Sequence, residues 1–101
     1  MRIWRFPLSP TPGQRHIDLK MPTAAKLLSV ALKDDEPCLW AMVDPEARMV
    51  ERRIEVMATG VDFANPFPPF VGTFVLEAIG REALVFHVFD GGEHELPKGS
   101  A

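Results

Sequence analysis

Few side chains of this chain could carry out chemistry, and His87 has the most unusual surroundings among them. It lies inside the apolar run Leu-Val-Phe-His-Val-Phe at residues 84–89. A polar ring among aromatic side chains can orient a ligand at the floor of a pocket. The alternative is a core histidine whose ring is hydrogen-bonded to a carbonyl, and the sequence pattern favours this alternative. His87 is thus a candidate ligand-binding residue whose role depends on what surrounds it.

The other reactive side chains lack the spacing that metal and catalytic sites use. The soft and imidazole ligands form no C-x-x-C or H-x-x-x-H pattern; they are Cys38, His16, His87 and His94. Cys38 follows a proline among apolar neighbours, which is typical of an inert buried thiol. No nucleophile elbow, phosphate loop or dinucleotide fingerprint occurs. We therefore expect a protein that is not an enzyme and has no metal or cofactor, and a hydrolase using His87 with Cys38 or Asp44 is the weakest hypothesis.

Tryptophan and arginine side chains form a candidate ligand-binding set with His87. Arginine offers a forked donor to phosphate or carboxylate, and tryptophan offers a flat face on which a base can stack. The set is Trp4, Arg5, Trp40, Arg52, Arg53 and His87. In the competing interpretation the strand arginines are solvated charges that pair with Glu51, Glu55 and Glu77. The pattern favours this second interpretation, because nothing in it brings the six residues together.

The segment at residues 60–69 has the strongest case for contact with a partner. Phe63, Phe67 and Phe70 recur there among Pro66, Pro68 and Pro69. Rigid aromatic side chains are the anchors that protein interfaces use. A loop folded over the end of the core as a lid would have the same composition. Both interpretations stay open at this point.

The elements that must position these residues are short runs rich in β-branched and aromatic residues, separated by turn signals. Alternation of side chains predicts strands at 2–6, 16–21 and 49–59, and the apolar run at 38–43 after a turn predicts another. Residues 24–33 suit a helix capped by Thr23 or a strand, and a hairpin that joins them to 38–43 is favoured. With two further strands this makes seven, which predicts an all-β, mainly antiparallel sandwich or small barrel with little or no helix. We expect a single domain over residues 1–90 and a flexible tail over 91–101.

The densest apolar block, residues 70–90, predicts a hairpin. Gly80 and Arg81 suit a two-residue turn with glycine first. This turn places Leu76 opposite Val85 and Phe74 opposite His87, so that Phe74, Leu76, Val85, His87 and Phe89 share one face. Both faces of the hairpin are largely apolar, which predicts a position inside a sheet that is covered on both sides.

Composition limits the compartment and the kinds of partner. The chain has 101 residues, a formal net charge of −3 and one cysteine. The negative charge gives no general attraction to nucleic acid or to an anionic membrane. A single cysteine cannot form an internal disulfide, and no apolar window has the length of a signal peptide or a membrane span. We therefore expect a cytoplasmic protein.

Several motifs in order resemble small uncharacterised proteins encoded by tailed bacteriophages and prophages. They are Trp-Arg-Phe-Pro at 4–7, Met-Pro at 21–22, Leu-Leu-Ser-Val at 27–30, Pro-Cys-Leu-Trp-Ala-Met-Val-Asp at 37–44, Gly-Thr-Phe at 72–74 and Leu-Val-Phe-His-Val-Phe at 84–89. The resemblance covers residues 1–90, and Cys-Leu-Trp-Ala and Val-Phe-His-Val-Phe are its more specific parts. It implies a compact domain in a phage or bacterial cytoplasm and brings no catalytic residue or ligand.

These observations lead to one main hypothesis about function and one alternative. The main hypothesis is a non-enzymatic phage or prophage accessory protein that binds a host protein, such as a target in counter-defence. The excess of apolar surface predicts a homodimer or higher homo-oligomer. The alternative is a sponge that sequesters an anionic small molecule or a signalling nucleotide through the tryptophan and arginine set.

Overall fold

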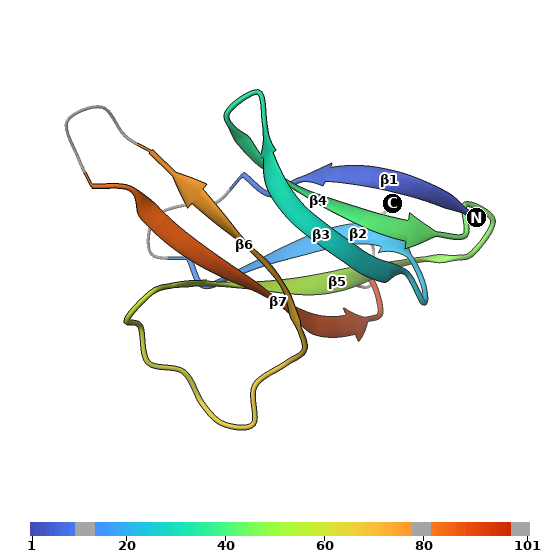
Figure 1. The fold of residues 1–101 in the computed structure, drawn as a ribbon. Coiled ribbons are helices and arrows are strands. Elements are labelled where there is room, and N and C mark those ends of the chain that lie inside the picture. Colours follow the sequence, from blue (N-terminus) through green and yellow to red (C-terminus); the bar gives the residue numbers. More distant parts are fainter. Residues whose placement is uncertain (10–13, 78–81, 98–101) are drawn as a thin grey trace.

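The computed structural model describes residues 1–9, 14–77 and 82–97 as seven strands in two sheets. The strands are β1 (Arg2–Pro7), β2 (His16–Pro22), β3 (Lys26–Lys33), β4 (Glu36–Val43), β5 (Met49–Ala58), β6 (Phe70–Leu76) and β7 (Leu84–His94). One sheet has the order β1-β4-β3 and the other β2-β5-β7-β6, and all neighbours are antiparallel. Figure 1 shows the two layers. The prediction of an all-β sandwich is confirmed, and the two separate sheets do not close into a barrel.

The described residues form no helix, so none of them could cross a membrane as a long apolar helix. The ambiguous segment at 24–33 is a strand, as the favoured interpretation predicted. It pairs with β4 through a two-residue turn in which Asp34 and Asp35 both have positive φ, 51° and 65°. Two central residues in this conformation match the twist of the flanking strands, and aspartate tolerates the conformation better than most residues. The turn therefore sets the register of the hairpin.

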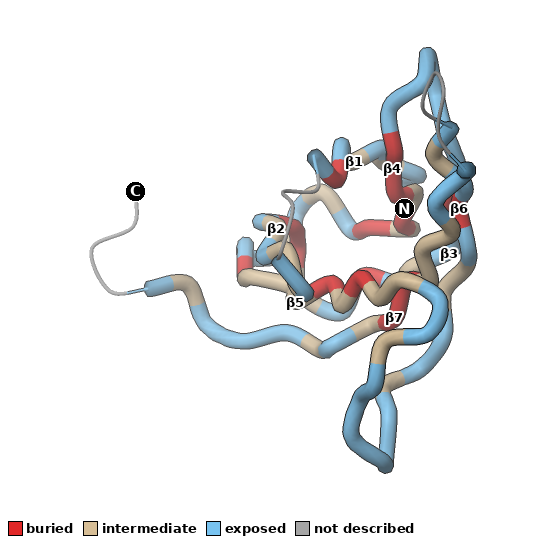
Figure 2. Tube along the Cα trace, turned by 90° about the vertical axis from the view of Figure 1, so that its left-hand side faces the viewer, coloured by how far each residue is buried: buried red, intermediate tan, exposed pale blue. Residues whose placement is uncertain are grey.

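The core lies between the two sheets and is built by alternation along the strands. In β4 the side chains of Leu39, Ala41 and Val43 are inaccessible to solvent, while the residues between them are partly exposed. The tube in Figure 2 shows the buried segments of the two sheets facing one another. The core cluster combines residues of every strand except β1 with Leu8 and Ala25, and it consists of Leu8, Met21, Ala25, Val30, Leu39, Ala41, Val43, Ile54, Val56, Phe74 and Val88. We call the side of each sheet that points away from this cluster its outer face.

The hairpin of β6 and β7 forms, but its predicted register is wrong by one residue. Phe74 pairs with Phe86 and Thr73 pairs with His87. The strands end at Leu76 and begin again at Leu84, so their connection is longer than the predicted two-residue turn, whose residues 80 and 81 lie outside the described part. Since a slip of one residue exchanges the two faces of a strand, packing of the core decides the register.

The faces of this hairpin differ accordingly from the prediction. Phe74 and Val88 point into the core together, and Phe86 packs against it. His87 and Phe89 share the outer face with Thr73 instead of with Phe74. The predicted cover on both sides is also wrong, because β6 is an edge strand and Val75 on its outer face is 40% exposed.

The predicted flexible tail begins too early, because β7 continues to His94. The strand passes Arg53 through a bulge, where Gly92 has φ +86° and a Cβ on Gly91 would lie 2.8 Å from the carbonyl oxygen of Arg53. Two glycines usually signal the end of a strand, but here they are the residues that the bulge requires. The prediction is therefore wrong for residues 91–94, and residues 98–101 lie outside the described part.

Gly72 lets β6 approach β3 of the other sheet closely. A Cβ on this residue would lie 2.9 Å from Cγ2 of Val30, which is itself buried. We expect Gly72→Ala to lower the free energy of unfolding by about 1–3 kcal/mol through overpacking. Urea denaturation of the two single variants and of Gly72→Ala combined with Val30→Ala would measure the coupling. We expect the Gly72→Ala change to cost less in the Val30→Ala background, whereas strictly additive costs would contradict this close contact.

Candidate functional site

Four phenylalanine side chains form a cluster on the outer face of the four-stranded sheet. Phe63, Phe67 and Phe70 surround Phe89 of β7, with ring centroids 6.0, 6.0 and 5.5 Å from its ring. Phe63 and Phe67 also meet edge to face at 5.9 Å. Phe89 is only 8% exposed, whereas the other three rings are 46%, 56% and 59% exposed. These four residues, the phenylalanine cluster, are held in place and still present a large aromatic surface to solvent.

The connection between β5 and β6 positions this cluster. It leaves β5 after Ala58, projects away from both sheets (Figure 1) and is exposed along most of its length (Figure 2). Its ends are fixed by backbone hydrogen bonds from Val61 N to Ala58 O at 3.2 Å and from Asp90 N to Pro69 O at 2.8 Å. Prolines in the connection restrict the unfolded chain, so less conformational entropy is lost when it is ordered. The rings of Phe63 and Phe67 in this connection pack on Phe89, which lies outside the central core cluster.

His87 lies on the same outer face, two residues before Phe89. Its Nε2 is 2.7 Å from Oγ1 of Thr59, and its Nδ1 is 3.0 Å from Oγ1 of Thr73. The ring is therefore partly buried between two hydroxyl groups, and these take the place of the carbonyl partner expected for a core histidine. Sequence reasoning missed both threonines, because the predicted register placed Phe74 opposite His87.

A hydrolase, the weakest hypothesis, would need Cys38 or Asp44 beside His87, but the hydrogen-bond partners of His87 are Thr59 and Thr73. Cys38 is buried in β4 of the other sheet and is 3% exposed. Asp44 follows β4 and accepts a hydrogen bond from the backbone N–H of Glu46 at 3.0 Å. A nucleophile and its base must lie within hydrogen-bond reach of one another, and Cys38 and His87 are on the opposite outer faces of the sandwich.

The six residues of the ligand-binding set also lie on different faces of the sandwich. Trp4 packs inward against the core, whereas Trp40 and its cross-strand neighbour Arg5 are on the outer face of the three-stranded sheet. Arg53 and His87 lie on the outer face of the four-stranded sheet. The remaining member, Arg52, belongs to a separate ion-pair network. The structure therefore brings Arg5 and Trp40 together and does not assemble the six into one pocket.

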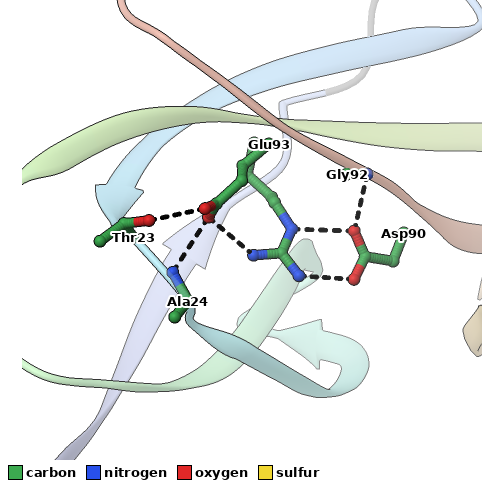
Figure 3. A network of polar contacts seen from close by, with 6 residues as sticks. Thr23, Ala24, Asp90, Gly92 and Glu93 are labelled. Atoms are coloured by element: carbon green, nitrogen blue, oxygen red, sulfur yellow. Dashed lines mark hydrogen bonds and ion pairs between the residues drawn. The ribbon is translucent and has the colours of Figure 1, made fainter.

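Arg52 is the centre of a polar network that sequence reasoning did not find (Figure 3). Its guanidinium donates to both carboxylate oxygens of Asp90 at 2.8 and 2.6 Å and reaches Glu93 at 3.4 Å. Glu93 in turn accepts from the Thr23 hydroxyl at 2.6 Å and from the Ala24 backbone N–H at 3.0 Å. The network links β5 and β7 to the connection between β2 and β3. One signal for it was present, because alternation puts Arg52 on the buried face of Val50 and Ile54.

Contacts within this network shift the pKa values of its charged groups. The hydrogen bond from Arg52 lowers the pKa of Asp90, helped by the backbone N–H of Gly92 and opposed by burial. The hydroxyl of Thr23 and the N–H of Ala24 lower the pKa of Glu93. The hydrogen bond to Asp90 raises the pKa of Arg52. All three groups are therefore held in their charged forms, as a structural ion pair requires.

A second polar group on the outer face could hold a metal ion. Single ligand atoms of Asp18, Glu51 and His94 all lie within 4.8 Å of one another. In the structure these atoms already have protein partners, because Arg53 donates to Asp18 at 3.2 Å and His94 lies 3.2 Å from Glu51. Carboxylate and imidazole ligands suit a divalent transition metal, which would have to displace both contacts.

The Arg52 network predicts how stability depends on pH. Because folding lowers the pKa of Asp90 and Glu93, their stabilisation is fully present above the unfolded values near ~4 and is lost as the pH falls through the folded values. We expect Asp90→Asn to lower the free energy of unfolding by about 1–3 kcal/mol at pH 7, because the Arg52 and Asp90 side chains are only 11% and 19% exposed. Denaturant titrations at several pH values measure this difference.

The exposed pair Arg48 and Glu95 provides a matched control. Its side chains are 60% and 74% exposed, so Arg48→Gln is expected to cost less than about 0.5 kcal/mol. The gap between wild type and Asp90→Asn should narrow as the pH falls from 5 to 3. A gap that stays constant over this range would show that ionisation of Asp90 does not stabilise the fold.

Comparisons with known proteins identify the family but no activity. A family model described as a domain of unknown function, DUF7352, matches residues 1–98, so the chain belongs to this family. No curated protein matches the chain. No solved structure matches it either.

Proposed function

We propose that this member of the DUF7352 family is a non-enzymatic binding protein whose phenylalanine cluster contacts another protein. The observation that carries the proposal is the half-exposed state of Phe63, Phe67 and Phe70 around the buried ring of Phe89. Aromatic surface in contact with water is unfavourable, and contiguous exposed apolar patches mark interaction sites. A partner that covers the three neighbouring rings explains this surface best.

The geometry of the cluster supports a protein partner. Large protein interfaces gain most of their affinity from aromatic anchors that are held rigidly before binding. Here Phe89 fixes the three other rings, and the proline-containing connection reduces the entropy lost on binding. Two partners fit this surface: a second copy of the chain, which would give a homodimer or higher homo-oligomer, and a protein of a bacterial host.

We place the protein in the cytoplasm of a bacterial cell and infer an origin in a bacteriophage or prophage. The resemblance of residues 37–44 and 84–89 to phage-encoded proteins supports this origin. The free, buried thiol of Cys38 suits a reducing compartment. Many accessory proteins of such origin act on host processes by binding, and counter-defence is one process in which this would serve the phage.

The alternative function, a sponge for an anionic small molecule or signalling nucleotide, has less support. It requires arginine donors and a tryptophan face in one cavity. Trp4, Trp40 and Arg53 are on three different sides of the sheets, so the residues of this set do not form such a cavity together.

Phe67→Ala is the variant that tests the proposed function. Loss of an aromatic anchor is expected to weaken association by about 2 kcal/mol or more, which is roughly thirtyfold in Kd. Because Phe67 is half exposed, the monomer should lose only about 1–2 kcal/mol, well below the 3–5 kcal/mol of a fully buried phenylalanine. Light scattering across a concentration series and capture from bacterial lysate measure association, and thermal melting of the dilute protein measures monomer stability.

Leu84→Ala is the matched control for this experiment. Leu84 is 54% exposed on the same sheet but is outside the phenylalanine cluster, so its removal should leave association unchanged. The proposal fails if Phe67→Ala associates like wild type. It also fails if the wild-type protein is a monomer and captures the same proteins from the lysate as the variant. The expected loss of monomer stability corresponds to a decrease in melting temperature of ~4–8 °C per kcal/mol. A much larger decrease would instead assign Phe67 a purely structural role.

A further inference from the structure

The outer face of the three-stranded sheet is a second surface with an unusual composition. Cross-strand neighbours form three rows over it. The rows are Ile3, Met42 and Lys26; Arg5, Trp40 and Ser29; and Pro7, Cys38 and Ala31. This face lies on the far side of the core from the phenylalanine cluster, because the core cluster is packed between the two sheets.

A shallow depression of about 430 Å³ occupies the middle of this face and is lined by Ile3, Leu28, Ser29, Ala31 and Trp40. Ile3 is 56% exposed and Leu28 is 37% exposed. The position of Leu28 results from an irregularity in β3, where the register shifts between Leu27 and Ser29. Leu27 packs on the core while Leu28 and Ser29 both line the depression. Bulges of this kind redirect side chains and recur beside binding sites.

The charges that lie beside the depression are positive. Arg5 and Lys26 lie in the first two rows, whereas the carboxylate of Glu36 lies beyond the third row, where Glu36 is the cross-strand neighbour of Lys33. Within the described part of the chain, neither Arg5 nor Lys26 lies in a salt bridge, unlike Arg48, Arg52 and Arg53. The protein as a whole has a net charge of −3, so these cations stand out against an acidic background. The face therefore offers an apolar depression with positive charge beside it.

We propose that this face binds an acidic peptide segment of a partner protein. An aliphatic or aromatic side chain of the segment would fill the depression against Trp40, and flanking carboxylates would pair with Arg5 and Lys26. Complementary charge favours such a segment over a neutral or basic one and accelerates its encounter with the surface. The proposal goes beyond the proposed function, because it concerns a second surface on the opposite side of the molecule.

Two other occupants are less compatible with the same observations. A symmetric dimer through this face would bring the Arg5 and Lys26 side chains of both copies into one interface, and an accumulation of like charges there is unfavourable. Single-stranded nucleic acid would use Trp40 as a stacking face, but it gains most of its affinity from many basic contacts to phosphates. Only two cations lie in these rows, and most of the lining is aliphatic.

Short synthetic peptides labelled with fluorescein test the proposal directly. The first peptide has two central leucines flanked by glutamates, the second has lysines in place of the glutamates, and the third has serines in place of the leucines. We expect the first peptide to bind at low ionic strength at least about tenfold more tightly than either other peptide, and to bind more weakly as salt is added. Fluorescence anisotropy measures each affinity.

Variants locate the binding and separate it from the proposed function. Arg5→Gln combined with Lys26→Gln, and separately Trp40→Ala, should each weaken binding of the acidic peptide about tenfold or more. Lys20→Gln, which removes one positive charge on the other sheet, should leave it unchanged, and so should Phe67→Ala. Circular dichroism melts verify that each variant is folded.

Three results would overturn the proposal. The first is equal affinity for all three peptides, or no measurable binding of the acidic one. The second is tighter binding of a single-stranded oligothymidine that depends on Trp40, which would assign the face to nucleic acid. The third is a dimer, detected by sedimentation, that Trp40→Ala dissociates, which would assign the face to a second copy of the chain.

Discussion

The contact on which the rest of the structure depends is the paired hydrogen bond between Arg52 and Asp90. Arg52 lies on the core-facing side of its strand, where a guanidinium without a partner would be strongly destabilising. Asp90 neutralises it, and Glu93 extends the contact to Thr23 and Ala24 at the point where the chain passes from one sheet to the other. The network thereby ties together the two layers at one end of the sandwich.

This requirement explains the path of the last strand. Asp90 and Glu93 can both reach Arg52 only because β7 contains a bulge between them. The bulge needs Gly91, where a Cβ would collide with the backbone of Arg53, and Gly92, which has a positive φ. No buried side-chain nitrogen or oxygen among the described residues lacks a hydrogen-bond partner. The interior is therefore electrostatically satisfied, and the exposed aromatic and aliphatic side chains on the outer faces are the features that remain to be explained by partners.

The two proposed surfaces follow from the same architecture. A sandwich buries one face of each sheet and leaves the other to solvent. On one outer face the connection after β5 brings Phe63 and Phe67, and the start of β6 brings Phe70, to the ring of Phe89. On the other outer face, a register shift in β3 places Leu28 beside Trp40 in the depression. Surfaces on opposite sides of a rigid core do not compete for space, so a protein of this kind is suited to hold two partners at once.

Strand positions were predictable from the sequence because each depends on a local pattern. Val50, Ile54 and Val56 recur with period two, whereas the strand around Leu39 and Val43 was identified as a short apolar run after a turn. Register and partners were less predictable, because they depend on contacts between distant residues. The turn signal at Gly80 suggested a register that core packing overrides.

The candidate site was only partly predictable for the same reason. Phe63, Phe67 and Phe70 stood out by composition. The role of Phe89 beneath them could not be predicted, because it depends on which face of β7 points away from the core. Arg52 appeared as a ligand donor because its true partners, Asp90 and Glu93, lie about forty residues away, beyond two glycines that resembled the start of a tail. Long-range ion pairs of this kind leave no local pattern in a sequence.

Site-specific photo-crosslinking determines whether the phenylalanine cluster contacts another protein. p-Benzoylphenylalanine would replace Phe67 in one variant and Leu84 in another, with irradiation of bacterial cells that produce each protein. We expect a discrete cross-linked product from position 67 that is absent from position 84, since both side chains are about half exposed but only Phe67 belongs to the cluster. No product from position 67, or the same products from both positions, would contradict the proposed contact.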